Sequence, residues 1–173
     1  MNNGLSINTK ILVNISLLIA MEVILRRFLS IATPIATIGF GFVPIAVCAI
    51  MYGPLLAGLA AAVSDIIGAT LFPIGTFFPG FTLSAALTGI VFGLFLHKRS
   101  GNLLQLLCAA SVNCLGVSLL ITTYWVAVIR GTPYMVTLAT RILPSFIMLL
   151  IQFTVLRLLQ KPVGLYLQSN LYK

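Results

Sequence analysis

Long apolar runs separated by short polar breaks dominate the chain. A helix needs about 20 mainly apolar residues to cross the hydrocarbon, so the pattern predicts six membrane-spanning helices. They are expected at residues 9–29, 42–52, 55–72, 81–96, 103–129 and 136–159. Residues 30–43 contain too much proline and glycine for a span and predict an ordered loop. The pattern therefore predicts an all-α integral membrane protein whose single domain covers residues 1–173.

The breaks between the runs predict turns and helix ends. Gly53-Pro54 is typical of a tight turn. Lys161-Pro162 is expected to end the sixth span, and the weakly amphipathic residues 163–173 are expected along the membrane surface. Small residues recur in the third and fourth spans, with Gly89 and Gly93 four residues apart. Such rows allow close helix packing, either within the protein or against a partner.

Composition supports this class. Of 173 residues, 60% are hydrophobic and 7% charged, and the mean hydropathy is +1.16, whereas soluble domains carry about a quarter charged residues. The net charge of +8 comes from bases dispersed at the ends of apolar runs, which favours a role in topology over nucleic-acid binding. The three cysteines lie inside apolar segments without metal-ligand spacing.

Charge placement predicts the orientation. Six spans put both termini on one side, together with all four lysines. Basic residues concentrate on the cytoplasmic side of membrane proteins, so that side is expected to carry Lys10, Lys98, Arg99, Lys161 and Lys173. Arg26, Arg27 and Arg130 are left outside, where an anionic ligand would explain them.

Residues 65–84 form the most unusual stretch. Asp65, one of two acidic residues in the protein, precedes a run that combines four backbone breakers with four phenylalanines: Pro73, Gly75, Pro79, Gly80, Phe72, Phe77, Phe78 and Phe81. Pro-Gly spacing on a loop would present flat aromatic faces to a planar heterocycle. We therefore expect this stretch to form much of the wall of a ligand pocket at the extracellular side.

The two carboxylates have different explanations. An acid inside a span costs on the order of 3 kcal/mol and is functional by default. Asp65 would accept two hydrogen bonds side by side, which suits the amino-pyrimidine edge of a pterin. Alternatively, it pairs with a buried arginine such as Arg141 and only holds helices together. Glu22 stands four residues before Arg26, so an intrahelical ion pair explains it.

Arginines and further aromatic residues complete the predicted site. Arg26 and Arg130 are expected to hold an anionic group through two-pronged hydrogen bonds, whereas headgroup contact competes as an explanation for Arg27. Arg141 lies too deep to remain unpaired and must face the interior. Trp125 and Tyr134 lie at interface depth, where an aromatic belt explains Tyr134 equally well.

The sequence contains no recognised catalytic constellation. It lacks a phosphate-binding Gly-x4-Gly-Lys-Ser/Thr loop, a His-Glu-x-x-His pair and a Gly-x-Ser-x-Gly elbow. No catalytic residue, metal site or cofactor is therefore expected. The protein is predicted not to be an enzyme and not to hydrolyse ATP itself.

Several segments resemble a known family. Phe78-Pro-Gly-Phe-Thr-Leu-Ser-Ala85, preceded by Ala62-Val-Ser-Asp65-Ile-Ile-Gly68 and Leu71-Phe-Pro73, is similar to the folate-specific substrate-binding (S) component of energy-coupling factor (ECF) transporters. Glu22-Val-Ile-Leu-Arg-Arg-Phe28 and Gly39-Phe-Gly-Phe-Val-Pro44 also match its pattern. The Phe-Pro-Gly-Phe-Thr-Leu-Ser run is specific to the folate-binding S component that the sequence resembles. The general S-component features alone would not distinguish folate from thiamin, riboflavin, biotin or pantothenate.

The resemblance implies a six-helix subunit of a prokaryotic cell membrane that captures folate outside the cell for ATP-driven uptake. Its partners would be a transmembrane coupling protein (the T component) and two ATPase subunits, and the loaded subunit would reorient in the bilayer. Family members dock through an Ala-x-x-x-Ala motif in the first helix, which corresponds here to Ser16 and Ala20. The substrate-binding residues expected are Arg26, Asp65, Phe78, Gly80, Phe81, Thr82, Trp125, Arg130, Tyr134 and Arg141.

Two alternatives remain open at this stage. An S component for another vitamin would share the architecture and differ in its ligand. A small stand-alone secondary carrier or channel would move its substrate without ATP. An intramembrane enzyme is a remote third, since no nucleophile–base pair is visible in the sequence.

Overall fold

The computed structural model describes residues 9–32, 37–73, 77–97 and 102–171, and the side chains of all of these except 31, 32, 37, 38 and 160–171. Gly75, Lys98, Arg99 and Lys173 lie outside the described residues, as does the side chain of Lys161. The elements in chain order are α1 (Thr9–Arg27), β1 (Ser30–Ala32), β2 (Thr37–Gly39), α2 (Phe42–Tyr52), α3 (Pro54–Leu71), α4 (Pro79–Leu96), α5 (Leu103–Ser111), the π-helix η1 (Val112–Thr122), α6 (Thr123–Arg130) and α7 (Tyr134–Leu171).

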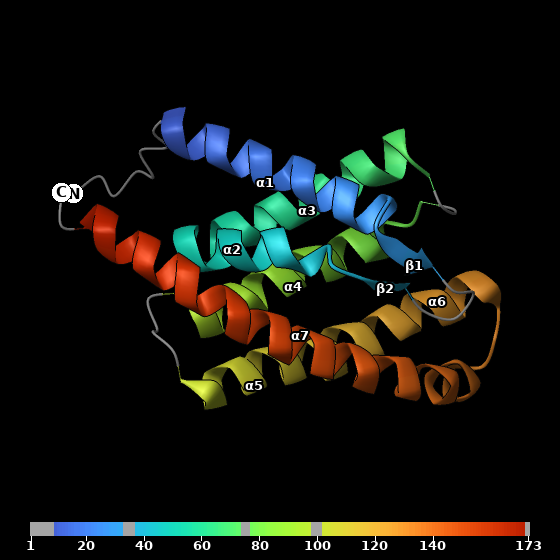
Figure 1. The fold of residues 1–173 in the computed structure, drawn as a ribbon. Helices are drawn as coiled ribbons and strands as arrows, with labels where there is room; N and C mark the ends of the chain where they lie inside the picture. Colours follow the sequence, from blue (N-terminus) through green and yellow to red (C-terminus); the bar gives the residue numbers. More distant parts are fainter. Residues whose placement is uncertain (1–8, 33–36, 74–76, 98–101, 172–173) are drawn as a thin grey trace, which may run out of the picture.

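The described helices correspond in order to the six predicted ones, because α5, η1 and α6 run on as one rod (Figure 1). Four segments among the described residues are long and apolar enough to cross a membrane: α3, α4, the α5–α6 rod and residues 134–159 of α7. α1 has 19 residues but carries Lys10, Glu22, Arg26 and Arg27. α2 has 11 residues and extends only about 16 Å at 1.5 Å per residue.

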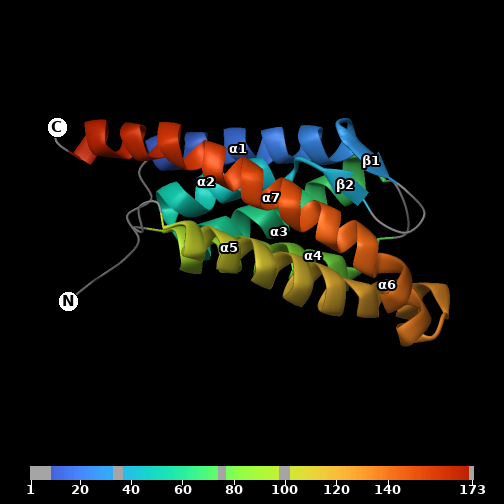
Figure 2. The same cartoon turned by 60° about the horizontal axis from the view of Figure 1, so that its bottom comes forward.

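The two ends of the bundle differ. α1 begins and α7 finishes at the same end, and the β1–β2 hairpin and the α6–α7 connection lie at the other (Figures 1 and 2). We call the latter the hairpin end. The prediction that an even number of crossings brings both termini to one end is confirmed. Which end faces the cytoplasm stays a prediction.

The predicted loop at residues 30–43 contains a short hairpin. β1 pairs antiparallel with β2, with Ser30 opposite Gly39. The close pairing leaves no room for a side chain at Gly39, where a Cβ would lie 2.5 Å from that of Ser30. The hairpin folds back at the end of α1 and leads directly into α2.

Small residues pack α3 against α4. These two helices make the most extensive helix–helix contact among the described elements. A Cβ on Gly89 would overlap the backbone of Ala57, and one on Gly93 would overlap Pro54. A Cβ on Gly58 would lie 2.8 Å from Ile90 Cγ1. The glycine row of α4 therefore serves internal packing, which decides one of the alternatives that the sequence leaves open.

Two predicted boundaries differ from the structure, and a proline lies at each. Pro79 and Gly80 were expected in a loop but form the first turn of α4, because proline at a helix N-terminus gives up only an N–H that has no intrahelical partner. Lys161-Pro162 was expected to end the last span. Instead α7 continues to Leu171, giving a helix of roughly 57 Å, so residues 163–171 prolong α7 beyond its apolar part.

The π-helix changes which side chains the fifth span turns inward. η1 covers 11 residues, and its wider turn is seen in Thr122, whose hydroxyl donates to the Val117 carbonyl five residues back at 3.0 Å. Asn113 and Cys114, at its first turn, are both buried. Single π-turns recur at functional sites because they redirect side chains, and η1 supplies polar side chains to the bundle interior.

Candidate ligand-binding site

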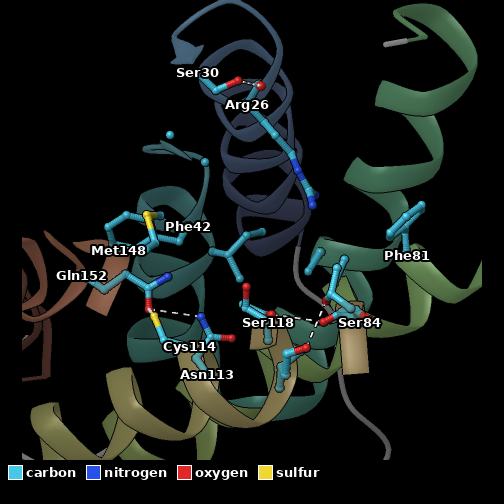
Figure 3. Close-up of a pocket in the computed structure, with 18 of the residues that line it drawn as sticks. Arg26, Ser30, Phe42, Phe81, Ser84, Asn113, Cys114, Ser118, Met148 and Gln152 are labelled. Carbon is cyan, nitrogen blue, oxygen red and sulfur yellow. Dashed lines mark hydrogen bonds between the residues drawn. The ribbon is translucent and has the colours of Figure 1, made fainter. Parts of the chain in front are cut away.

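A cavity of about 380 Å³ lies inside the helix bundle. Ligand pockets commonly measure about 300–1,000 Å³. Its wall includes residues of α1, the hairpin, α2, α3, α4, η1, α6 and α7. Arg26 reaches into it from α1, and Asn113, Cys114 and Gln152 lie across from it on η1 and α7 (Figure 3). The polar side chains that line it are Glu22, Arg26, Ser30, Ser84, Thr88, Asn113, Ser118, Thr122, Arg130, Arg141 and Gln152.

An ion-pair cluster occupies the α1 side of the cavity. Arg26 Nη1 lies 3.2 Å from Glu22 Oε1 and 3.2 Å from Asp65 Oδ1. The predicted pair of Glu22 with Arg26 is confirmed. The Glu22 and Asp65 residues are 3% and 5% exposed, whereas the Arg26 side chain is 39% exposed. One guanidinium therefore serves two buried carboxylates on different helices.

Asp65 uses both of its oxygens within the protein. Oδ1 pairs with Arg26, and Oδ2 accepts a 2.9 Å hydrogen bond from the Thr82 hydroxyl of α4. The carboxylate thus ties α1, α3 and α4 together. Asp65 itself is not among the residues of the cavity wall. The partner of Asp65 is Arg26, not Arg141.

Two arginines lie close together on the other side of the cavity. Arg130 ends α6 and Arg141 stands two turns inside α7, and both line the wall. They are near enough to repel each other electrostatically. Arg141 is 7% exposed, and its Nε donor is buried with no partner among the described residues. The prediction that Arg141 faces the interior is confirmed. Two neighbouring guanidinium groups in a cavity favour an anion between them.

An amide cluster forms the part of the wall between η1 and α7. Gln152 Oε1 accepts hydrogen bonds from Asn113 Nδ2 at 3.1 Å and from Cys114 Sγ at 3.2 Å. Asn113 Oδ1 is buried and has no partner among the described residues. Because an amide oxygen accepts two hydrogen bonds, this cluster offers acceptor capacity to an uncharged donor in the cavity.

The aromatic cluster lies beside the cavity, with only part of it in the wall. Trp125 Nε1 donates to Ser84 Oγ at 3.2 Å, and its ring centroid lies 5.5 Å from that of Phe78. The indole packs so closely on α4 that a Cβ at Gly80 would lie 2.5 Å from Trp125 Cδ2. Phe81 and Ser84 line the cavity. Gly80 is thus required by the close approach of Trp125.

The predicted residues fall into three groups. Arg26, Phe81, Arg130 and Arg141 line the cavity. A second group lies behind the wall. Asp65, Phe78 and Trp125 each contact a wall residue, Thr82 contacts Asp65 and Gly80 packs against Trp125. Tyr134 lies apart, with its hydroxyl 3.5 Å from the Leu120 carbonyl oxygen. Sequence analysis missed Glu22, Ser84, Asn113 and Gln152, whose only signal was polarity inside apolar spans.

The predicted docking residues lie on the surface of α1. Ser16 and Ala20 are both exposed and stand one turn apart. The Ser16 hydroxyl donates to the Leu12 carbonyl at 2.9 Å, so its polar group is already satisfied within the helix. A small exposed row of this kind permits close approach of another helix. Among the described residues, no three His, Cys, Asp or Glu side chains come together as a metal site would need.

Apolar spans around a cavity lined by both polar and apolar side chains define a membrane-embedded ligand-binding protein. The model of the family described as the ECF-type riboflavin transporter, S component, matches residues 6–173. The chain therefore belongs to the S-component family of ECF transporters. It is accordingly a multi-pass membrane protein of a transport family and not an enzyme.

Named relatives are similar over most of the chain. The folate transporter FolT of Clostridium novyi (strain NT) is 38% identical over 138 residues, which cover 80% of each chain. The folate transporter FolT of Leuconostoc mesenteroides subsp. mesenteroides is 36% identical over 93 residues, covering 54% of this chain and 50% of that protein. A crystal structure of FolT bound with folic acid superposes with a TM-score of 0.85 at 29% identity, covering 90% of this chain and 95% of the other.

Proposed function

We propose that the protein is the folate-binding S component of an ECF transporter. It would capture folate for ATP-driven uptake with a T component and two ATPase subunits. The relatives at 38% and 36% identity are named folate transporters, and the similar solved structure is described as bound with folic acid. Because the sequence contains no phosphate-binding loop, energy would come from the ATPase partners. Folate is the transported ligand, and no further cofactor is proposed.

The arginine pair is the observation that favours folate over riboflavin. Folate ends in a glutamate with two carboxylates, whereas riboflavin carries no charge at neutral pH. Arg130 and Arg141 both line the cavity. Arg141 is 7% exposed and its Nε donor has no partner among the described residues, so a ligand carboxylate would satisfy it, whereas a neutral vitamin brings no anionic group. We propose that these two arginines hold the glutamate tail.

The rest of the wall suits a flat heterocycle. Phe42 and Phe81 contribute apolar faces, and Asn113 and Gln152 contribute amides. Aromatic faces and a few fixed polar groups are the usual means of orienting such ligands. We propose that the pterin ring lies between these residues, with Phe78 and Trp125 supporting Phe81 and Ser84 from behind.

Calorimetry in detergent would test this assignment. We expect the purified protein to bind folate and not riboflavin. The variant Arg141→Met should weaken folate by about tenfold or more, since hydrogen bonds to charged groups contribute about 1.5–3 kcal/mol. Arg157→Met, which removes an exposed arginine of the same helix, is the matched control and should bind like the wild type. Riboflavin binding with no folate binding would contradict the assignment.

The orientation and partner surface follow as further proposals. We propose that the hairpin end faces outward, because Lys10 and the sequence positions Lys98, Arg99 and Lys173 then lie on the cytoplasmic side. The exposed Ser16–Ala20 row would dock on the T component. The glycines of α4 are already covered by α3, so α1 is the better candidate for that contact.

The stand-alone carrier remains the competing function. Reconstitution into vesicles separates the two, because a carrier would move folate down its gradient without other subunits. We expect the protein alone to bind folate without transporting it. Uptake should require the T component, both ATPase subunits and ATP.

A further inference from the structure

We propose that Glu22 supplies the hydrogen-bond acceptor for the amino-pyrimidine edge of the ligand, and that Arg26 positions this carboxylate instead of binding the anionic tail. The proposal rests on the folate function and concerns the orientation of the ligand in the same cavity. It assigns a ligand role to Glu22, a residue that sequence analysis explains by its ion pair alone.

The two carboxylates differ in how many of their oxygens already have a hydrogen-bond or ion-pair partner. Both Asp65 oxygens are engaged, by Arg26 and by Thr82, and Asp65 does not line the cavity. Glu22 does line it. Its Oε1 pairs with Arg26, and its Oε2 is buried with no hydrogen-bond partner among the described residues. The Ser64 hydroxyl lies near Glu22 and donates to the Ala61 carbonyl at 3.0 Å.

An unpaired carboxylate oxygen in a buried wall requires a donor. Leaving a charged acceptor unsatisfied costs more than leaving a neutral one, so a ligand that brings an N–H to Oε2 binds more tightly than one that does not. The 2-amino-4-oxopyrimidine ring of a pterin presents two such N–H groups side by side. Oε2 would accept one of them, and Oε1 would accept the other through the lone pair that Arg26 does not use.

Charge explains why the tail would not bind at Arg26. Arg26 already has two carboxylate partners, and the neighbouring Arg27 interacts electrostatically with all three groups, so the formal charges of the four residues sum to zero. A ligand carboxylate would therefore gain little at Arg26, whose charge is already compensated. Arg130 and Arg141 are positive. α1 and α6 lie on opposite sides of the bundle in both views (Figures 1 and 2), so the positive residues lie away from α1.

Different groups at the two sides of the cavity would orient the ligand. The donor edge of the pterin would point to α1, and the glutamate would point to α6 and α7. Under this assignment Asp65 and Thr82 are positioning residues, because they hold Arg26 and touch no ligand atom. Glu22 is then the residue that selects a 2-amino ring over a 2-oxo ring.

The test compares two neutral ligands that differ only at that edge. 6-Methylpterin carries a 2-amino group and 6-methyllumazine a 2-oxo group, and neither has a carboxylate tail. Competition against labelled folate would give both affinities. We expect the wild type to prefer 6-methylpterin by about tenfold or more, as a hydrogen bond to a charged group predicts. In Glu22→Gln the ratio of the affinity for 6-methylpterin to the affinity for 6-methyllumazine should approach one, because the amide can donate to the 2-oxo group.

Three further arms separate the explanations. Arg141→Met should weaken folate and leave the affinity for 6-methylpterin within about twofold, whereas Glu22→Gln should weaken both ligands by a similar factor. If Glu22→Gln does not fold, Glu22→Asp is the second variant. It keeps the negative charge but its side chain is one methylene shorter, so the carboxylate lies farther from the ligand and the same affinity ratio should fall. An unchanged ratio in a folded Glu22 variant would overturn the proposal. Failure of the wild type to bind folate would instead overturn the proposed function.

Discussion

The Arg26 guanidinium joins α1 to α3 through an ion pair with Asp65, at an Nη1–Oδ1 distance of 3.2 Å. The same Nη1 also pairs with Glu22. Since both carboxylates are nearly inaccessible, neither can use water in place of the arginine. The pair therefore couples the stability of this helix contact to the shape of the cavity wall.

Removing Arg26 should destabilise the protein, because the two buried carboxylates lose their ion-pair partner and keep only Arg27 as a nearby positive charge. Breaking a buried ion pair costs about 3–5 kcal/mol, and partial exposure of the guanidinium favours the low end. Arg26→Met should lower the midpoint of thermal unfolding in detergent by about 6 °C or more. Adding Asp65→Asn should recover part of the loss. An Arg26→Met midpoint equal to that of Arg157→Met would show that the pair contributes nothing.

Gly80→Ala should displace Trp125. The new methyl would lie 2.5 Å from the indole ring, so the ring or the first turn of α4 must move. Trp125 is the only tryptophan in the chain, so its emission spectrum reports this movement directly. We expect a shifted emission maximum and weaker folate binding. Gly116→Ala is the matched control, because its nearest neighbour would be 4.0 Å away, and it should leave both unchanged.

Gly89→Ala should separate α3 from α4. Its methyl would overlap the Ala57 carbonyl, and backbone atoms cannot rotate away as a flexible side chain does. Overpacking of this kind costs about 1–3 kcal/mol. Thermal unfolding should show a lower midpoint for Gly89→Ala than for Gly116→Ala. Equal midpoints would mean that the helix contact is looser than the structure indicates.

Labelling of single cysteines would test the proposed orientation. Thr132→Cys places a thiol at the hairpin end and Asn102→Cys places one at the opposite end, both at exposed positions. The background would lack Cys48, Cys108 and Cys114. On intact cells, a membrane-impermeant maleimide should label the Thr132→Cys variant and spare the Asn102→Cys variant. The reverse labelling pattern would show that the hairpin end faces the cytoplasm.

The spans were predictable because the lipid contact requires long apolar runs. α2 begins and ends where its pattern predicts, and the other spans agree within about two residues except at the end of α7. At Pro79 and Pro162 the predicted helix boundary differs from the observed one for the same reason. The sequence signal of proline is a break, but its structural effect depends on whether a helix begins, ends or continues there.

The site was only partly predictable because pairing depends on three-dimensional proximity. The costs of burial predict that Asp65 and Arg141 face the interior. They do not predict that Arg26 serves both Glu22 and Asp65, since α1 and α3 are separated by the hairpin and α2. Asn113 reaches the cavity from a π-helix, whose wider turn alters the helical period used to assign faces.

Folate binding by the purified wild-type protein tests the central claim most directly. Calorimetry in detergent should show one folate bound per chain, with a dissociation constant below about 1 µM, equivalent to about −8.2 kcal/mol or tighter. Riboflavin at the same concentrations should give no saturable heat. Absence of folate binding at micromolar ligand, with or without a riboflavin signal, would contradict the account.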